Sequence, residues 1–186
     1  IGTTGITGGR VLPPLIQRFE EKFPEVRLKL VEETTKKLVD LTTNGQVDLS
    51  LLALPIEEPC LSVETIITEP LFLAIPRVVK GWMSKSVQEI IRFADQPFLQ
   101  VSFPLHEFAK APFILLKKGF GFRQTLLELC AESSFQPQIA YETSSIETAQ
   151  SLVAFGLGVT LVPKMVTNRC QDNQSSPFYL PLDTNP

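Results

Sequence analysis

The chain has 186 residues, of which 44% are hydrophobic and 20% are charged. These values are ordinary for a globular protein and exclude a disordered one, and the length suffices for one sizeable domain or two small lobes. The net charge of −3 argues against a chain that binds nucleic acid by itself, because such chains usually carry a basic face.

Residues 1–30 predict a strand, a turn, a helix and a second strand. Ile1 and Gly2 end the first strand, and the small residues TTGITGG form the turn. One apolar helix face follows and closes before Pro24, and residues 26–30 then alternate apolar and charged side chains as a strand does. The apolar helix face comprises Leu12, Leu15, Ile16, Phe19 and Phe23.

A second helix and a third strand come next. Thr34 or Thr35 can cap a short helix that ends at Gly45. Residues 47–54 are a nearly continuous apolar run, as expected for a buried strand. The first 54 residues are therefore predicted as β-α-β-α-β, the repeating unit of a parallel sheet.

The middle of the chain and its last part predict shorter elements. In chain order they are a strand at 71–75, a helix at 86–94, strands at 98–102 and 113–116, a helix at 122–132, a weak helix from 164 onward and a final apolar stretch at 178–182.

Residues 138–163 carry the strongest local pattern. An alternating strand leads to Ser144, which precedes Glu147 by three residues, the spacing of a helix capping box. Gly156 is expected to end this helix in a left-handed conformation, and residues 159–162 form an apolar strand. This strand–helix–strand order predicts a β-α-β crossover in an α/β sheet.

The β-α-β pattern occurs twice, in residues 1–54 and 98–163, which predicts two lobes of similar architecture. Ligands of such sheets bind outside the carboxyl ends of the strands, where Ser144 and Ser145 would lie. Two lobes linked by extended strands would leave a cleft between them. Hinge closure around a small molecule is then the motion to expect.

Four segments occur in a characteristic order: IGTTGITGGRVLPPLIQRFEEKFPEV, LVEETTKKLVDLTTNGQVDLSLL, EPLFLAIP and SSIETAQSLVAFGLGVTLVPKM. In this order they resemble the effector-binding domain of LysR-type transcriptional regulators. The resemblance implies an α/β fold of two Rossmann-like lobes joined by crossover strands, like a type II periplasmic binding protein. It places lobe I at residues 1–74 plus 164–186 and lobe II at residues 75–163. Family members carry an N-terminal winged helix-turn-helix that binds DNA, and its absence would explain the abrupt start and the acidic charge.

The resemblance also implies which residues contact a small effector, because family members hold it between the lobes. By position these would be Thr4, Gly5 and Ile6 in the first turn, Thr35 at the second helix, and Ser102, Ser144 and Ser145 in lobe II. Hydroxyls and free backbone N–H groups at helix starts suit a carboxylate or another anion, so the chemistry agrees. Arg123, which follows a Gly-rich turn into a helix, could add an anion contact.

Each of these residues also has a purely structural interpretation. The threonines could be turn and cap residues, although a cap can still donate to a ligand. Arg123 could be a solvated surface charge. The GFGF stretch before it is not a dinucleotide fingerprint, because the third glycine and the phosphate turn are missing.

Cys60, Cys130 and Cys170 are widely spaced and form no CxxC pair, so neither a disulfide framework nor a metal site is predicted. Free thiols fit a reducing compartment. Peroxide-sensing members of the family place two reactive cysteines around the equivalent of GFGFRQTLLELC. Cys130 could match the second of these, but Gly or Phe occupies the first position, so redox sensing is disfavoured. His106 is the only histidine and lies in a loop without a nucleophile arrangement, which argues against catalysis.

The sequence thus predicts the sensor half of a bacterial, cytoplasmic transcription factor that is not an enzyme and has no cofactor. A small anionic metabolite, such as a carboxylate, would shift an equilibrium of lobe orientation. The resemblance implies a homodimer, with tetramers in the full-length proteins and DNA contact only through the missing N-terminal domain. No membrane partner is expected. The alternative is a solute-binding protein of a transport system with the same fold, which three unpaired cysteines disfavour.

Overall fold

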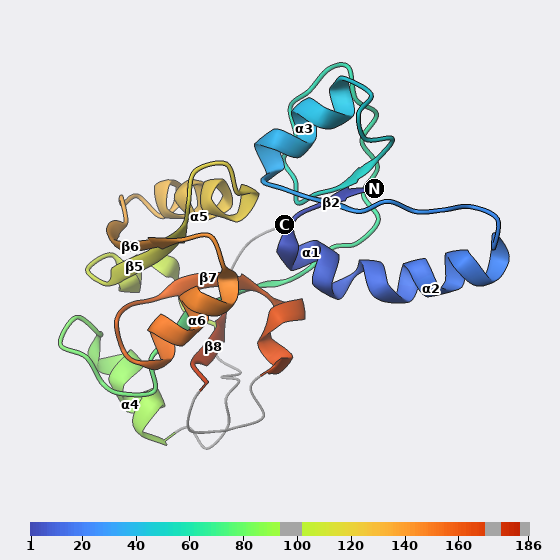
Figure 1. Ribbon diagram of the computed structural model, residues 1–186. Coiled ribbons are helices and arrows are strands. Elements are labelled where there is room, and N and C mark those ends of the chain that lie inside the picture. Colours follow the sequence, from blue (N-terminus) through green and yellow to red (C-terminus); the bar gives the residue numbers. More distant parts are fainter. Residues whose placement is uncertain (94–101, 170–175, 183–186) are drawn as a thin grey trace. The chain divides into compact units, whose positions relative to one another are not determined.

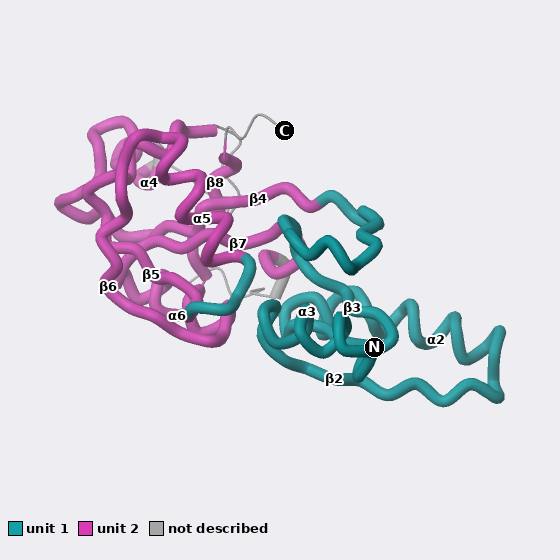
Figure 2. The backbone as a smooth tube through the Cα atoms, turned by 90° about the horizontal axis from the view of Figure 1, so that it is seen from above, with its two compact units in different colours: residues 1–68, 118–121 teal, residues 69–117, 122–186 magenta. Residues whose placement is uncertain are grey.

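The computed structural model describes residues 1–93, 102–169 and 176–182 (Figure 1). The chain forms two compact units (Figure 2). Unit 1 comprises Ile1–Thr68 and Lys118–Gly121, and unit 2 comprises Glu69–Lys117 and Phe122–Pro186. In the described ranges, no helix combines the length and the apolar character needed to cross a membrane.

Unit 1 is built on a three-stranded parallel sheet with the order β2-β1-β3. The strands are β1 (Gly2–Thr3), β2 (Val31–Glu32) and β3 (Ser50–Leu51), and the register pairs Gly2 with both Val31 and Ser50. This arrangement confirms the predicted β-α-β-α-β order. The strands are much shorter than predicted, however, since residues 26–30 form no strand and only two residues of 47–54 pair.

A helix occurs where the sequence predicts one, and a second, shorter helix replaces most of the predicted turn TTGITGG before it. Helix α1 (Gly5–Arg10) and helix α2 (Leu12–Lys22) are separated at Val11. The cause is the Pro13–Pro14 pair in the first turn of α2, because neither proline has an N–H to donate to the carbonyl four residues earlier. A continuous helix would therefore leave two carbonyl groups of α1 without partners.

Helix α3 (Thr35–Thr43) packs directly on β1. Its N-cap is Thr34, whose Oγ1 accepts a hydrogen bond from the Lys37 N–H at 3.4 Å, so the first of the two predicted caps is the one used. Leu38 is fully buried, and a Cβ on Gly2 would lie 2.7 Å from its side chain. Gly2 therefore permits the close contact between helix and strand. Gly45 follows the helix with φ +67°, as predicted for its C-terminal end.

Unit 2 contains two groups of strands. Strand β4 (Leu71–Ile75) lies between β7 (Thr160–Pro163) and β8 (Phe178–Pro181), antiparallel to both. Strands β5 (Pro112–Leu116) and β6 (Gln138–Thr143) form a parallel pair. A parallel bridge between Phe113 and Val159, supported by a 2.7 Å bond from Thr160 Oγ1 to the Ile114 carbonyl, connects β5 to β7.

The remaining helices of this part are α4 (Lys85–Phe93), α5 (Gly121–Glu132) and α6 (Ile146–Ala154), with 3-10 helices η1 (Leu105–Phe108) and η2 (Lys164–Arg169). Helix η2 corresponds to the weak helix predicted after residue 164. Of the predicted strand at 98–102, residues 98–101 lie outside the described residues, and Ser102 is not in a strand. Cys170 and the end of the predicted helix at 86–94 also lie outside them.

The β-α-β crossover predicted for residues 138–163 is confirmed, with one correction at its cap. Strand β6 leads into α6, and β7 follows with Gly156 at φ +80° after the helix. The N-cap is Ser145, not Ser144, since Ser145 Oγ accepts the Thr148 N–H at 3.2 Å. Thr143 stabilises this arrangement, because its Oγ1 accepts the Ser145 N–H and holds the turn before the helix. The helix therefore begins one residue later than the capping-box spacing predicts.

The two units differ from the predicted lobes at β4, at Lys118–Gly121 and at the end of the chain. Residues 69–74 and the described residues after 164 belong to unit 2, whereas the prediction assigns them to lobe I. The physical reason is that β4 pairs with both β7 and β8, so one sheet and one core include all three. Arg77 adds a further tie, since its guanidinium lies 4.3 Å from the ring centroid of Phe178 and donates to the Ser176 carbonyl.

The core of unit 2 forms where these strands meet the helices. It joins the buried faces of β4, β5, β7 and β8 with one face each of α4 and α5. Its fully buried side chains include Leu73, Ile75, Phe108, Phe113, Leu115, Cys130 and Leu180.

We expect Gly158→Ala to destabilise the fold at the start of β7. A Cβ at this position would collide with the Pro112 carbonyl oxygen, which already accepts the Val159 N–H at 2.9 Å. The free energy of unfolding should fall by about 1–3 kcal/mol in urea denaturation. Gly9→Ala is the matched control, because nothing lies within 4 Å of its added Cβ and alanine favours a helix. Equal stability of the two variants would contradict this account of the contact.

Candidate functional site

In unit 1, the predicted first-turn residues follow directly after β1. Thr4 is buried and is the N-cap of α1, but its side chain makes no capping bond and instead lies 3.3 Å from Thr7 Oγ1. Gly5 is exposed and Ile6 is half-buried. Since β1 and β2 are parallel, this turn lies at the same sheet edge as the end of β2.

A carboxylate already faces this turn. Glu32 is the last residue of β2, and its Oε1 lies 3.0 Å from where a Cβ on Gly5 would be. The first turn of a helix has unpaired backbone N–H groups and a partial positive charge, so an acidic group is stabilised there. Glu32 therefore supplies negative charge at the position where the sequence predicts an anionic ligand.

Thr35 is the first residue of α3, and its hydroxyl is engaged. Thr35 Oγ1 accepts the Gly121 N–H at 3.2 Å, and the Lys36 N–H donates to the Gly119 carbonyl at 3.4 Å. Because Thr34 provides the cap, the Thr35 hydroxyl keeps its own proton available for donation. Thr35 can therefore both hold the segment 118–121 and donate to a bound acceptor.

In unit 2, Ser144 and Ser145 follow β6 and have different roles. Ser145 Oγ accepts the Thr148 N–H and lies 3.0 Å from Glu147 Oε2, so its hydroxyl is committed to the cap. Ser144 is exposed beside it. Of the two predicted effector contacts, Ser144 is thus the one whose hydroxyl is not part of the cap.

Ser102 is exposed, and the described structure gives it no contact with the other candidate residues. It precedes Phe103, which is buried and bridges to Leu182. The bridge anchors the backbone next to Ser102 and leaves its side chain open to solvent.

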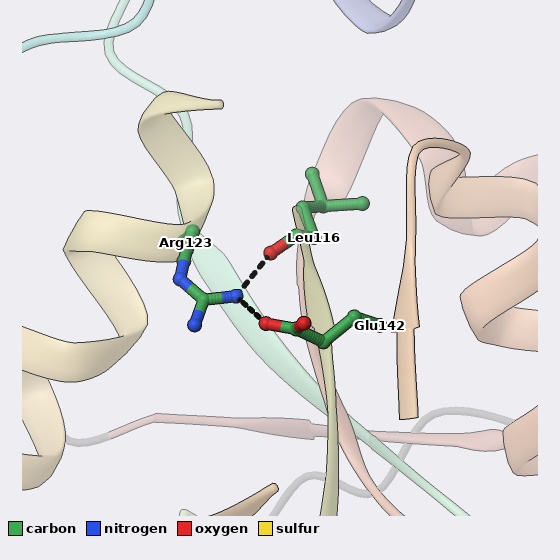
Figure 3. A network of polar contacts seen from close by, with 3 residues as sticks. All are labelled: Leu116, Arg123 and Glu142. Carbon is green, nitrogen blue, oxygen red and sulfur yellow. Dashed lines mark hydrogen bonds and ion pairs between the residues drawn. The ribbon is translucent and has the colours of Figure 1, made fainter. Parts of the chain in front are cut away.

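Arg123 lies at the carboxyl end of the parallel pair β5–β6 (Figure 3). Its Nη1 donates to the Leu116 carbonyl at 2.8 Å and to Glu142 Oε1. The side chain of Arg123 is 12% exposed, whereas that of Glu142 is 45% exposed. The interpretation of Arg123 as a solvated surface charge is therefore wrong, because the guanidinium is largely buried and ion-paired.

Sequence reasoning missed Glu142 as part of this site. Its signal is weak, a single acidic residue near the end of an alternating strand. The strand register brings it to Arg123: β6 has an irregularity opposite Phe113 and Ile114, after which Leu115 pairs with Glu142 and Leu116 with Thr143.

Arg10 is a second basic residue with an unusual environment. Its Nη2 is buried and has no hydrogen-bond partner in the described ranges. Arg10 is the last residue of α1, however, so it lies at the helix end opposite Thr4 and Gly5. The helix dipole favours a cation at this end. Arg10 therefore does not belong to the candidate site at the edge of β1 and β2.

The site residues therefore form two groups, one in each unit. Thr4, Gly5, Ile6 and Thr35 follow the parallel strands β1 and β2, and Arg123 and Ser144 follow β5 and β6. Both groups combine hydroxyls or a guanidinium with helix starts, which is the chemistry of anion binding.

Comparison with known proteins gives a consistent result. The family model of the LysR substrate binding domain matches residues 1–176. The uncharacterised HTH-type transcriptional regulator YcgK of Bacillus subtilis (strain 168) is 44% identical over the whole chain, which spans 57% of that relative's length. The chain thus spans about half the length of the curated relatives it matches.

Two solved structures illustrate the fold. The effector binding domain of QuiR in complex with shikimate superimposes with a TM-score of 0.79 at 17% identity, covering 100% of this chain and 80% of that one. A reduced form of OxyR from N. meningitidis gives a TM-score of 0.73 at 24% identity, again covering 100% of this chain and 80% of that one. These similarities confirm the predicted fold class.

We expect Cys130 to be unreactive in the native protein, because burial raises the pKa of its thiol to about 12. A raised pKa keeps the thiol protonated at pH 8, and only the thiolate attacks disulfide reagents. In a Cys170→Ser background, Ellman's reagent at pH 8 should titrate the exposed Cys60 rapidly and Cys130 only after unfolding. Rapid labelling of Cys130 in the folded chain would contradict the inert assignment.

Proposed function

The chain belongs to the LysR substrate-binding domain family, and from this we propose that it is the ligand-sensing part of a transcriptional regulator. Its effector is a small anionic metabolite, such as a carboxylate. The observation that carries this proposal is the position of Thr4–Ile6 and Thr35 directly after the parallel strands β1 and β2, at the starts of α1 and α3. Hydroxyls and backbone N–H groups meet there at one sheet edge.

The proposed effector contacts keep the residues predicted from the sequence. Thr4, Gly5, Ile6 and Thr35 contribute from unit 1, and Ser102, Ser144, Ser145 and Arg123 contribute from unit 2. Ser145 would have to exchange a bond that it makes within the chain, because its hydroxyl caps α6 and its N–H donates to Thr143 Oγ1. The cleft between two lobes remains a prediction of the sequence analysis.

Binding without chemical conversion fits the residues at these edges. The described residues contain no group of three or more His, Cys, Asp or Glu side chains placed to hold a metal ion. His106 is exposed in η1 and Cys130 is buried in the core, so neither provides a nucleophile or base at the candidate edges. The proposal is therefore a sensor that works in the cytoplasm by differential affinity for two conformations.

The alternative function is a solute-binding protein of a transport system, which would share the fold. The names of the relatives favour the sensor, since YcgK and the other curated relatives are transcriptional regulators by name. DNA binding and tetramer formation would then belong to the whole protein.

We also propose that the chain forms a homodimer through α2. Leu15 and Phe19 on this helix and Phe23 at its C-cap are exposed, and the rings of Phe19 and Phe23 lie with centroids 4.9 Å apart at a tilt of 41°. Adjacent exposed aromatic and aliphatic side chains are typical of protein–protein contacts.

Thr35→Ala and Ser102→Ala should each weaken effector binding by about 1–3 kcal/mol, as expected for a lost hydrogen bond to a charged group. A thermal-shift screen of carboxylates, amino acids and aromatic acids, with shikimate included, identifies a ligand, and calorimetry then measures its affinity. Thr43→Ala is the control, because it removes a threonine hydroxyl from the opposite end of α3. Unchanged affinity in both site variants would refute the contact assignment.

Phe19→Asp should convert the dimer to a monomer, since a charge in the centre of an apolar contact is costly to bury. Sedimentation velocity measures the change in mass. Val63→Asp, which also replaces an exposed apolar side chain of unit 1 by a carboxylate, should leave the dimer intact. A wild-type chain that sediments as a monomer at high concentration would refute the proposed homodimer.

A further inference from the structure

The contact between Arg123 and Glu142 has an uneven burial that bears on ligand binding. Arg123 is mostly buried and Glu142 is nearly half exposed. A buried guanidinium without a counter-charge is costly, so Arg123 requires an acidic partner. Glu142 can return to water more readily than Arg123, because its carboxylate side chain is already 45% exposed. Glu142 is therefore the partner of this ion pair that another anion can replace.

The guanidinium is held in place by more than Glu142. Its Nη1 also donates to the Leu116 carbonyl at the end of β5, a bond that does not depend on the carboxylate (Figure 3). Within the described part of the chain, neither Nε nor Nη2 of Arg123 has a hydrogen-bond partner. Arg123 can therefore stay in position and still offer donors to another anion.

The surroundings of the pair also favour negative charge. Helix α5 begins two residues before Arg123, and α6 begins shortly after Glu142, so both helix starts follow the carboxyl ends of the parallel strands β5 and β6. Helix starts carry partial positive charge and unpaired N–H groups. A carboxylate at this edge gains from these groups as well as from Arg123.

We infer that Glu142 is an internal counter-ion which the effector's anionic group replaces at Arg123. Glu142 is thus a specificity-determining residue: it neutralises Arg123 in the free chain and makes binding depend on a carboxylate or phosphate strong enough to displace it. This inference rests on the proposed effector function and assigns one contact within it. It predicts that removing the charge of Glu142, while keeping its shape, strengthens anion binding.

The test compares Glu142→Gln with the wild-type chain. Glutamine can still accept the Nη1 bond through its amide oxygen, so Arg123 keeps its position. Acetate and inorganic phosphate are titrated separately at constant ionic strength, and the Arg123 side-chain Nε–H signal is followed by NMR. Glu132→Gln is the matched control, because it removes the same charge at the last residue of α5, roughly 14 Å along the helix from Arg123.

The expected result is a shift of the Nε–H signal that saturates at about three- to tenfold lower anion concentration in Glu142→Gln than in the wild type. Glu132→Gln should behave like the wild type. A response to acetate alone identifies a carboxylate site, and a response to phosphate alone identifies a phosphate site.

Two results would overturn the inference in different ways. If Glu142→Gln lowers the unfolding temperature but saturates at the wild-type concentration, the pair is only structural, and the proposed effector function still stands. If the Arg123 signal responds to neither anion in any variant, the inference fails. If, in addition, no anion in the thermal-shift screen binds the wild type, the proposed function fails as well.

Discussion

The parallel pairing of strands is the constraint on which the candidate site depends. Parallel neighbours end at the same edge of a sheet, and each strand is followed by a segment that turns back toward a helix. In unit 1 this brings Thr4 and Thr35 to the edge of β1 and β2, and in unit 2 it brings Arg123 and Ser144 to the edge of β5 and β6. The backbone geometry therefore collects helix starts and hydroxyls before any ligand is present. Negative charge is the natural complement, and the protein supplies some of its own through Glu32 and Glu142.

Helices and their ends could be predicted from the sequence because the signals that define them are local. Gly45 and Gly156 adopt the positive φ that a helix end requires. Thr34, one of the two predicted caps, is the N-cap of α3. The strands of unit 1 could not be placed as well. Each has only two paired residues, and what selects them is the register with β1, which no short stretch of sequence encodes. The division at Val11 was predictable in principle, since two consecutive prolines cannot lie in a helix interior.

The candidate site shows the same division between local and non-local information. The resemblance selected turn residues by position, and the structure places Thr4, Thr35, Ser144 and Arg123 after the expected strands. The partner of Arg123 could not be found in this way. The irregularity in the pairing of β5 with β6 shifts the register by one residue, and a shift of one residue reverses which side chains share a face. Whether Tyr141 or Glu142 lies opposite Leu115 is decided there. The choice between Ser144 and Ser145 as cap has a similar origin, in the bond from the Ser145 N–H to Thr143.

A sensor must be stable both with and without its ligand, and this sets a condition on a buried cation at the binding edge. An arginine that waited without a counter-charge would destabilise the free chain, and one that was permanently paired would have nothing to offer an effector. A partner that is half exposed satisfies both requirements, because water replaces the arginine when the carboxylate leaves. The affinity of the effector is then measured against Glu142 and not against bulk water. Competition with Glu142 lowers the apparent affinity of the effector, so the internal carboxylate sets the effector concentration at which the chain responds.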